Sequence, residues 1–141
     1  LKIVPDERLT DFCYADWQGL EEGEVKQRWP AEHENWVSRP ESIRVPGGDT
    51  LAEVFEKAFG AMEEIAAKHR GETVAIVAHR VVNKLLVLGG LGLGLERFAF
   101  IWQDNCCVDE FEWRERGYVV VALNDTSHLR GQGVDLLDTD F

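Results

Sequence analysis

The chain has 141 residues, of which 45% are hydrophobic and 29% are charged. This mixture is typical of one globular domain that is large enough to bury a core. The formal net charge of −11 and the sequence pI near 4.7 argue against nucleic acid or an anionic membrane as a partner, because those surfaces select for clustered Lys and Arg. A small anionic substrate is compatible with the composition if basic groups gather locally.

The three cysteines, Cys13, Cys106 and Cys107, include no CxxC pair. An odd number of cysteines without a metal-binding spacing fits a reducing compartment, so we expect packing residues in a cytoplasmic protein. No uninterrupted apolar run is long enough to cross a membrane, and the start Leu-Lys-Ile-Val-Pro lacks a signal-peptide pattern. We therefore expect no membrane partner.

The first third of the chain reads as loops and one short helix. Leu9 to Leu20 mixes aromatic rings with carboxylates and predicts an ordered loop that packs its rings. Glu21 to Arg28 predicts a short acidic helix that Pro30 terminates. The following stretch, Trp29 to Gly48, has three prolines and no sustained period. Long connections of this kind are usually binding loops or lids, so we interpret residues 23–48 as a lid or insertion.

The middle of the chain alternates helix, strand and helix. Thr50 and Glu53 have the capping-box spacing ahead of an amphipathic helix that stops at Gly71. Thr73 to Ala78 is a short β-branched apolar run that predicts a strand buried on both faces. Val81 to Gly90 has helical periodicity and predicts a helix that stops at Gly89 and Gly90. This order favours a three-layer α/β/α fold with a mostly parallel central sheet.

The last third predicts a hairpin and an acidic end. Cys107 to Trp113 and Tyr118 to Leu123 are strand-like runs joined by Arg-Glu-Arg-Gly. We expect this antiparallel hairpin to lie at an edge of the sheet. Residues 130–141 form an acidic tail that we expect to be loosely held. The whole of 1–141 is interpreted as one domain.

His79 stands where the Thr73 to Ala78 strand ends and the next helix begins. In open α/β sheets, ligands bind outside the carboxyl ends of the strands, and free N–H groups at a helix start favour anions. The alternative is structural, because a histidine at a strand end can simply hydrogen-bond a neighbouring loop. Asp11 has a similar alternative as a turn-forming residue.

Four stretches in this order resemble the histidine phosphatase superfamily, the phosphoglycerate mutase-like proteins. LTDFCYADWQG resembles the family's L-x-E-x-x-F-G-x-W-E-G segment, and PGGDT resembles its P-G-G-E-S turn ahead of a helix. TVAIVAHR resembles the strand that ends in the second active-site histidine. LNDTSHL resembles a common C-terminal ending. The resemblance covers most of the chain and corresponds to the C-terminal two-thirds of the family's domain.

The resemblance implies a metal-independent phosphatase that acts on a small phosphorylated metabolite through a phosphohistidine. It makes His79 the second histidine, which binds phosphoryl oxygens, and Asp11 the general acid and base. Positioned donors suit the charge of a phosphoryl group in the transition state, and we expect Arg80, Val81 and Tyr14 to contact the substrate. The resemblance implies no cofactor and no metal.

Several departures separate the chain from the family's pattern. Asp11 replaces the usual Glu and is one methylene shorter, Ala15 replaces a Gly, and Arg80 replaces a small residue. Arg80 therefore has two interpretations, as a phosphate contact or as a solvent-facing residue at a helix start. The family's Arg-His-Gly nucleophile motif occurs nowhere in the sequence.

We therefore expect the N-terminal strand-helix units, with the nucleophile, to lie in a missing segment of the same domain. The chain alone is expected to be inactive. Alternative functions are mutase-type phosphoryl transfer, a non-catalytic binding relative of the family, and an unrelated α/β binding domain. A homodimer is an open alternative for its assembly.

Overall fold

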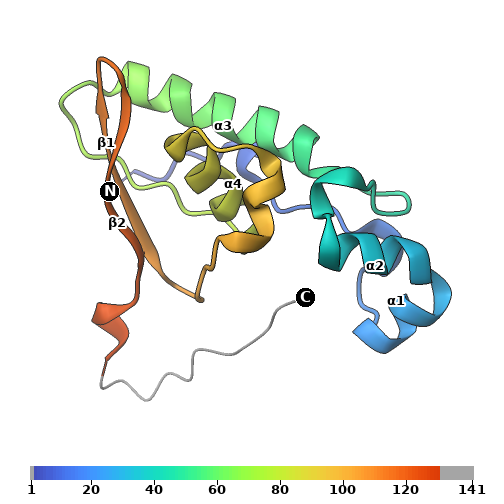
Figure 1. Cartoon of the computed structure of the whole chain (residues 1–141). Coiled ribbons are helices and arrows are strands. Elements are labelled where there is room, and N and C mark those ends of the chain that lie inside the picture. The colour runs from blue at the N-terminus through green and yellow to red at the C-terminus, as the bar shows by residue number, and fades with distance from the viewer. Residues whose placement is uncertain (1, 131–141) are drawn as a thin grey trace.

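The computed structural model describes residues 2–130. Two long helices, α3 and α4, lie at the centre, with a pair of short helices at one end and a β-hairpin at the other (Figure 1). The bounds of the elements are α1 Glu22–Arg28, α2 Pro30–Ser38, α3 Leu51–Lys68, α4 Arg80–Leu91, β1 Val108–Arg114 and β2 Gly117–Asp125. The predicted acidic tail beyond Arg130 lies outside the described residues.

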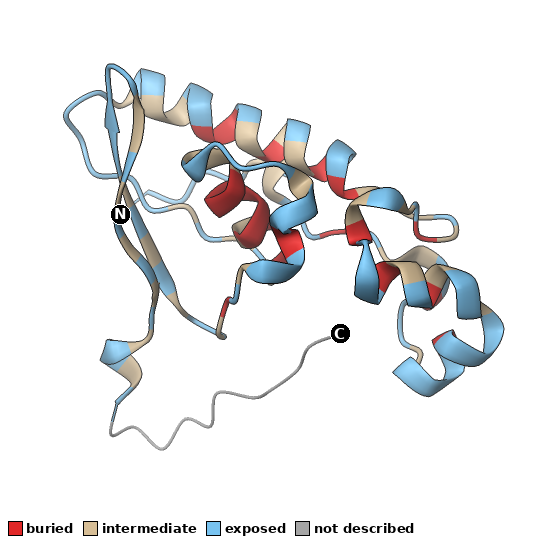
Figure 2. Cartoon of the chain, viewed as in Figure 1, coloured by how far each residue is buried: buried red, intermediate tan, exposed pale blue. Residues whose placement is uncertain are grey.

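Helix α3 begins where its capping signal predicts. The Thr50 side chain accepts a hydrogen bond from the Glu53 backbone N–H at 3.2 Å, and the Glu53 carboxylate accepts one from the Thr50 N–H at 3.0 Å. This reciprocal pair satisfies two N–H groups that have no partner within the helix. The buried face of α3, made by Leu51, Val54, Ala58, Ala61 and Met62, packs against α4 (Figure 2). The predicted helix is confirmed.

Helix α4 is the most buried element of the described chain (Figure 2). Val82, Leu85 and Leu88 are fully buried in the core, and each such side chain contributes roughly 1.5–3 kcal/mol through burial. The predicted stop at Gly89 and Gly90 is slightly too early. The helix continues to Leu91, and its C-cap is Gly92, whose φ is +66°.

The two glycines inside α4 serve close packing. A Cβ at Gly89 would lie 2.2 Å from the ring of Phe59 on α3, and one at Gly90 would lie 2.7 Å from the ring of Phe111 on β1. Neither ring could stay in place beside a larger residue. Gly89 and Gly90 therefore let α3 and the hairpin approach α4.

The predicted irregular connection after Trp29 is partly wrong. Pro30 begins the nine-residue helix α2 rather than only ending α1. Proline is well tolerated at the first helical position, where its missing N–H needs no partner. The buried side chains of His33 and Trp36 fix α2 to the core. Within residues 23–48, the helices α1 and α2 are followed by a short 3-10 helix at Pro40–Ser42 and a turn. The role of this segment as a lid stays a prediction.

The predicted buried strand from Thr73 to Ala78 is not formed. Within the described part of the chain this segment has no ladder partner, and it lies as irregular backbone before α4. Val77 is 89% exposed and Val74 is 44% exposed. A strand needs a neighbouring strand for its backbone hydrogen bonds, so the apolar pattern alone cannot form one. The mostly parallel central sheet is accordingly absent from residues 2–130.

The predicted hairpin is confirmed. Strands β1 and β2 pair antiparallel, with Trp113 opposite Tyr118 and Phe111 opposite Val120. Gly117 follows the two-residue turn with a φ of +120°, which a residue with a side chain rarely adopts. The register is irregular on both sides of Glu110. Phe111 and Tyr118 both pack against the core cluster that surrounds α4.

The cysteines differ from the expectation. Cys13 and Cys106 are exposed and Cys107 is partly buried, and all three are free thiols. Only Cys107 therefore approaches the expected packing role. Within residues 2–130, no helix has the length and apolar content that a membrane span requires.

Candidate functional site

His79 and Asp11 are far apart in the sequence and come together in the structure. His79 is the N-cap of α4, and its Nδ1 lies 3.5 Å from Oδ2 of Asp11. The exposed fractions of the two side chains are 57% and 49%, so both are open to a ligand from solvent. The other Asp11 oxygen, Oδ1, accepts the backbone N–H of Phe12 at 2.8 Å. Asp11 thus bonds the backbone of its own loop and also faces His79.

The loop that carries Asp11 is held by the Pro46 to Thr50 turn. The Cys13 N–H donates to the Asp49 carboxylate at 3.0 Å, and the Cys13 carbonyl accepts the Asp49 N–H at 3.1 Å. Gly48 lies so close that a Cβ there would be 2.2 Å from the Cys13 carbonyl oxygen. Two of the stretches that resemble the family, LTDFCYADWQG and PGGDT, therefore pack against each other through hydrogen bonds. We call this contact the clasp, and it positions Asp11.

Ala15, which replaces a Gly of the family's pattern, has a backbone conformation that glycine favours. Its φ is +37°, in the left-handed region where a residue with a Cβ is strained. The neighbouring Asp16 N–H donates to the Pro46 carbonyl at 3.3 Å. The chain therefore keeps a glycine-like backbone turn at Ala15.

Aromatic rings fix the same loop to α2. The rings of Phe12 and Tyr14 lie 5.3 Å and 5.7 Å from that of Trp36, measured between centroids. Burial, and after it the negative charge of Asp11, raise the pKa of Tyr14 to about 12, against the smaller opposing influence of the positive charge of Arg80. The Tyr14 hydroxyl consequently stays protonated near neutral pH and can donate a hydrogen bond.

The start of α4 supplies the other predicted substrate contacts. The Asn83 N–H donates to the His79 carbonyl at 2.8 Å, so the N–H groups of Arg80 and Val81 precede the first hydrogen bond of the helix. The Val81 side chain itself is buried in the core. The half-buried Arg80 places its guanidinium carbon 5.1 Å from the Trp102 ring centroid. Arg80 therefore stacks on an aromatic ring and does not simply face solvent, as one of its two interpretations from the sequence had it.

Arg80 is positioned by residues that sequence reasoning did not identify. Asp104 accepts the Trp102 indole N–H at 2.9 Å and the Asn124 side-chain amide at 2.8 Å. Asn124, with a φ of +50°, also accepts the Asp104 backbone N–H at 2.7 Å. These hydrogen bonds hold the pKa of Asp104 below its usual range. The LNDTSHL stretch is thereby tied to the ring beneath Arg80, a contact that no local pattern in the sequence signals.

A cavity of about 230 Å³ lies beside the start of α4. Its lining includes Arg80, Lys84, Trp36, Phe98, His33 and Glu22. Lys84 and His33 are 8% and 7% exposed, and the His33 Nε2 lies 3.1 Å from the Glu22 carboxylate. Sequence reasoning missed this cavity because its lining comes from four separate segments: α1, α2, α4 and the 3-10 helix Leu95–Phe100.

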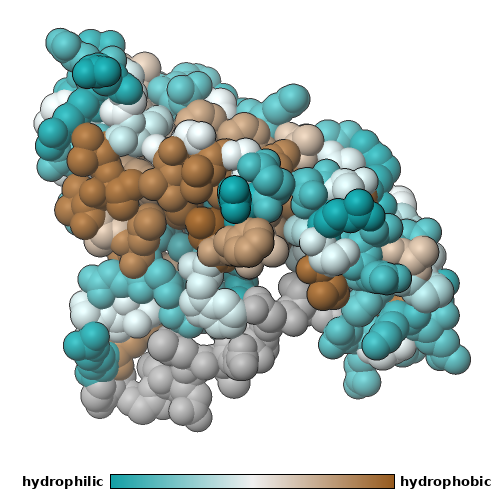
Figure 3. Space-filling view, in the orientation of Figure 1, coloured by the Kyte–Doolittle hydropathy of each residue, from teal (hydrophilic) through white to brown (hydrophobic). Residues whose placement is uncertain are grey.

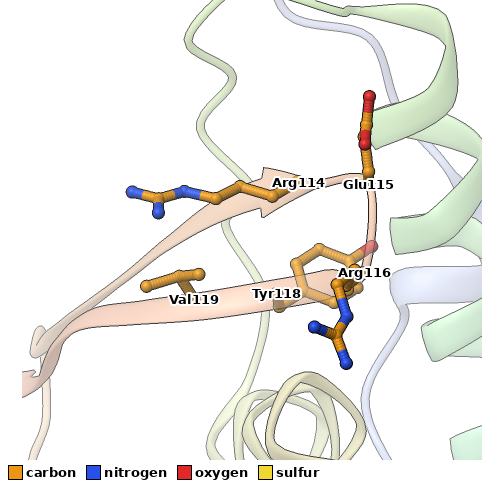
Figure 4. A pocket seen from close by; sticks show the side chains of 6 residues that line it. Arg114, Glu115, Arg116, Tyr118 and Val119 are labelled. Atoms are coloured by element: carbon orange, nitrogen blue, oxygen red, sulfur yellow. The ribbon is translucent and has the colours of Figure 1, made fainter.

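A second hollow lies at the hairpin turn, lined by six consecutive residues from Arg114 to Val119. Its two arginines, Arg114 and Arg116, point away from one another (Figure 4). Arg114 contacts the Glu112 carboxylate. The hollow therefore offers no converging set of charged groups. No cluster of His, Cys, Asp or Glu suited to a metal ion occurs within the described residues.

Known proteins resemble the chain along most of its length. Residues 1–126 match the profile of the histidine phosphatase superfamily (branch 1). The chain is 30% identical to phosphoserine phosphatase 1 of Hydrogenobacter thermophilus over 129 residues, which are 92% of the chain and 61% of that protein. It is 26% identical to a metal-independent phosphoserine phosphatase of Arabidopsis thaliana, over 92% of the chain and 52% of the relative.

The structure has close neighbours of the same fold. It superposes on Bacillus stearothermophilus YhfR with a TM-score of 0.83 and 28% identity, over 88% of the chain and 62% of YhfR. It also resembles the phosphoserine phosphatase of Entamoeba histolytica, with a TM-score of 0.76 and 18% identity over 88% of the chain and 62% of that protein. The chain spans less than two thirds of the length of these relatives. It has an α/β fold like theirs, and it belongs to the histidine phosphatase superfamily.

Proposed function

We propose that the protein containing this chain is a metal-independent phosphomonoesterase that hydrolyses a small phosphorylated metabolite. The observation that carries this proposal is the approach of His79 Nδ1 to Asp11 Oδ2 at 3.5 Å, at the N-terminus of α4 and open to solvent. This arrangement provides a proton donor beside a set of phosphoryl-binding groups. The two relatives described as phosphoserine phosphatases make phosphoserine the first substrate to test.

In the proposed reaction, a histidine outside this sequence attacks phosphorus and the ester oxygen leaves. The protonated Asp11 carboxyl gives its proton to that oxygen, so the product is a neutral alcohol. The resulting Asp11 carboxylate then takes a proton from water as the water attacks the phosphohistidine. Inorganic phosphate leaves and the nucleophile is restored, so every proton is accounted for. His79, Tyr14 and the N–H groups at the start of α4 would hold the phosphoryl oxygens.

We propose that the missing nucleophile lies on a segment that pairs with Thr73 to Ala78. Val77 and Val74 expose apolar side chains directly before His79, and the relatives are longer than this chain. The face seen in Figure 3 also gathers hydrophobic residues around the hairpin and α4. A strand added beside Thr73 would complete a mostly parallel sheet and cover this surface. The chain alone should then hydrolyse no phosphate ester.

Mutagenesis of the protein with its upstream residues tests the proposal. We expect His79→Ala to lower kcat for phosphoserine by about 10²–10³-fold, as for the loss of one transition-state donor. His69→Ala is the matched control, because His69 lies at the end of α3 with its Nδ1 2.9 Å from the Glu72 carboxylate. Full activity of His79→Ala would contradict the assigned role.

The leaving group tests Asp11 separately. Asp11→Asn should lower kcat/KM for phosphoserine, which reports the steps up to formation of the phosphohistidine, by about 10²–10⁴-fold. The loss should be much smaller with p-nitrophenyl phosphate, because nitrophenolate leaves without needing a proton. Equal losses on both substrates would contradict the proton-donor role. A parent protein that binds phosphate but turns over neither substrate would instead be a non-catalytic relative.

A further inference from the structure

We propose that Asp49 is a positioning residue for proton transfer to the leaving group. Through the backbone N–H of Cys13, its carboxylate sets where Asp11 lies, and it acts by its length and its acceptor oxygen, not by its charge. This inference rests on the proposed function, since it names the side chain on which the reach of the acid depends. The reaction described above gives Asp49 no part.

Two adjacent backbone N–H groups beside Asp11 are each held by a carboxylate. The Phe12 N–H donates to Asp11 Oδ1 at 2.8 Å, and the Cys13 N–H donates to Asp49 Oδ2 at 3.0 Å. Peptide groups are planar, so only two backbone torsion angles can change at each residue between Asp11 and Cys13. The direction of the Cys13 N–H therefore limits the direction of the Asp11 side chain.

The contact between Asp49 and Cys13 is closed at two points. The Asp49 N–H donates to the Cys13 carbonyl at 3.1 Å, while the Asp49 carboxylate accepts the Cys13 N–H. Both the N–H and the carbonyl of Cys13 are thus bonded to one residue, and the size of this ring depends on the length of the Asp49 side chain. A Glu in this place would add one C–C bond, about 1.5 Å, to the ring. The two backbones would then have to move apart.

The aromatic core keeps the loop from following such a change as a whole. Phe12 is 4% exposed, and its ring packs against that of Trp36 on α2 with the centroids 5.3 Å apart. Since Phe12 lies between Asp11 and Cys13 in sequence, a shift at Cys13 turns the chain about this fixed ring. Asp11 then moves relative to His79 on α4, whose Nδ1 lies 3.5 Å from its Oδ2.

The charge of Asp49 is balanced by a neighbour on α3. The Lys57 Nζ lies 3.8 Å from Asp49 Oδ2, and the Asp49 side chain is 27% exposed. Opposite charges this close largely cancel at a distance, and solvent screens what remains. What Asp49 offers the Asp11 loop is therefore an acceptor oxygen at a fixed distance from its own backbone.

The test separates side-chain length from charge in the protein with its upstream residues. Asp49→Asn keeps the length and an acceptor oxygen, whereas Asp49→Glu keeps the charge and adds a methylene. We expect Asp49→Asn to keep kcat/KM for phosphoserine within about threefold of wild type. Asp49→Glu should lower it by about tenfold to a hundredfold, as for a displacement on the order of 1 Å. With p-nitrophenyl phosphate, whose leaving group needs no proton, both variants should stay within about threefold.

Glu56→Gln is the matched control, because it removes a carboxylate charge from an exposed position on α3 and should change neither substrate. Equal losses of Asp49→Glu on both substrates would show a purely structural role and overturn the proposal. Full activity of Asp49→Glu on phosphoserine, or a larger loss in Asp49→Asn, would overturn it as well. If Asp49→Glu does not fold, Asp49→Ala, which lacks the acceptor oxygen, serves the same comparison.

A failure of the proposed function gives a different result. If the wild type hydrolyses neither compound, the proposed function fails, and crystal structures of wild type and Asp49→Glu test the placement of Asp11. A separation of His79 Nδ1 and Asp11 Oδ2 that grows by about 1 Å supports the role of Asp49. An unchanged separation of 3.5 Å would overturn it.

Discussion

The two segments that flank His79 differ in whether their backbone N–H and C=O groups find hydrogen-bond partners. On its C-terminal side, α4 makes its own hydrogen bonds and buries Val82, Leu85 and Leu88 completely. On its N-terminal side, Thr73 to Ala78 has no ladder partner within residues 2–130 and leaves Val77 89% exposed. A helix is complete within one segment, whereas a strand needs another. The fixed half of the site is therefore the helical half.

The largest expected effect comes from replacing one large apolar side chain by Ala on either side of His79. In the 1–141 chain, Leu88→Ala should lower the free energy of unfolding by about 2–5 kcal/mol, because it leaves a cavity in the core. Val77→Ala should change it by no more than about 0.5 kcal/mol, as for a surface position. Urea denaturation measures both. A loss at Val77 as large as that at Leu88 would mean that the two flanks are equally packed.

A smaller effect is expected where the turn clasps the Asp11 loop. Gly48→Ala places a Cβ 2.2 Å from the Cys13 carbonyl, and the resulting shift should cost about 1–3 kcal/mol. A displacement of Asp11 on the order of 1 Å should lower phosphatase activity of the longer protein by up to about a hundredfold. The matched control is Gly60→Ala in α3, where a Cβ meets nothing within 4 Å. That change should stabilise the helix by about 0.5–1 kcal/mol, and equal losses at both glycines would contradict the clasp.

The smallest effect concerns the cap of α3. Hydrogen bonds from Arg44, and then from Thr50, lower the pKa of Glu53 to about 2. Since the folded-state pKa lies below the unfolded value, the stabilising contribution is present above pH 4.5 and is lost as the pH falls toward 2. The melting temperatures of wild type and Glu53→Gln should therefore differ at pH 7 and converge near pH 2. A difference that does not change with pH would show that the charge of Glu53 is unimportant.

Local signals in the sequence predicted the local structure. The Thr50 cap, the periodicity of α3 and the hairpin around Gly117 each depend on nearby residues, and all three were confirmed. The helix that begins at Pro30 was not predicted, because proline is common both after the end of one helix and in the first turn of the next. The strand from Thr73 to Ala78 was predicted wrongly because its partners cannot be read from its own residues.

The candidate site divides in the same way. Motif resemblance singled out His79 and Asp11, and the structure brings them to 3.5 Å. The positions of Trp36, Trp102 and Lys84 depend on contacts between segments far apart in the chain. Periodicity reads the apolar face of a helix and does not reveal which buried lysine lines a cavity. Such residues could be identified only once α2 and α4 were placed beside one another.

Amide hydrogen exchange of Thr73 to Ala78 tests the account most directly, measured in the 1–141 chain and in the protein with its upstream residues. The account predicts fast exchange for these amides in the 1–141 chain and at least hundredfold slower exchange in the longer protein, with Val82 to Leu88 protected in both. Equally fast exchange of Thr73 to Ala78 in the longer protein would contradict the completed sheet. Protection of this segment already present in the 1–141 chain would contradict the contrast between the two flanks of His79.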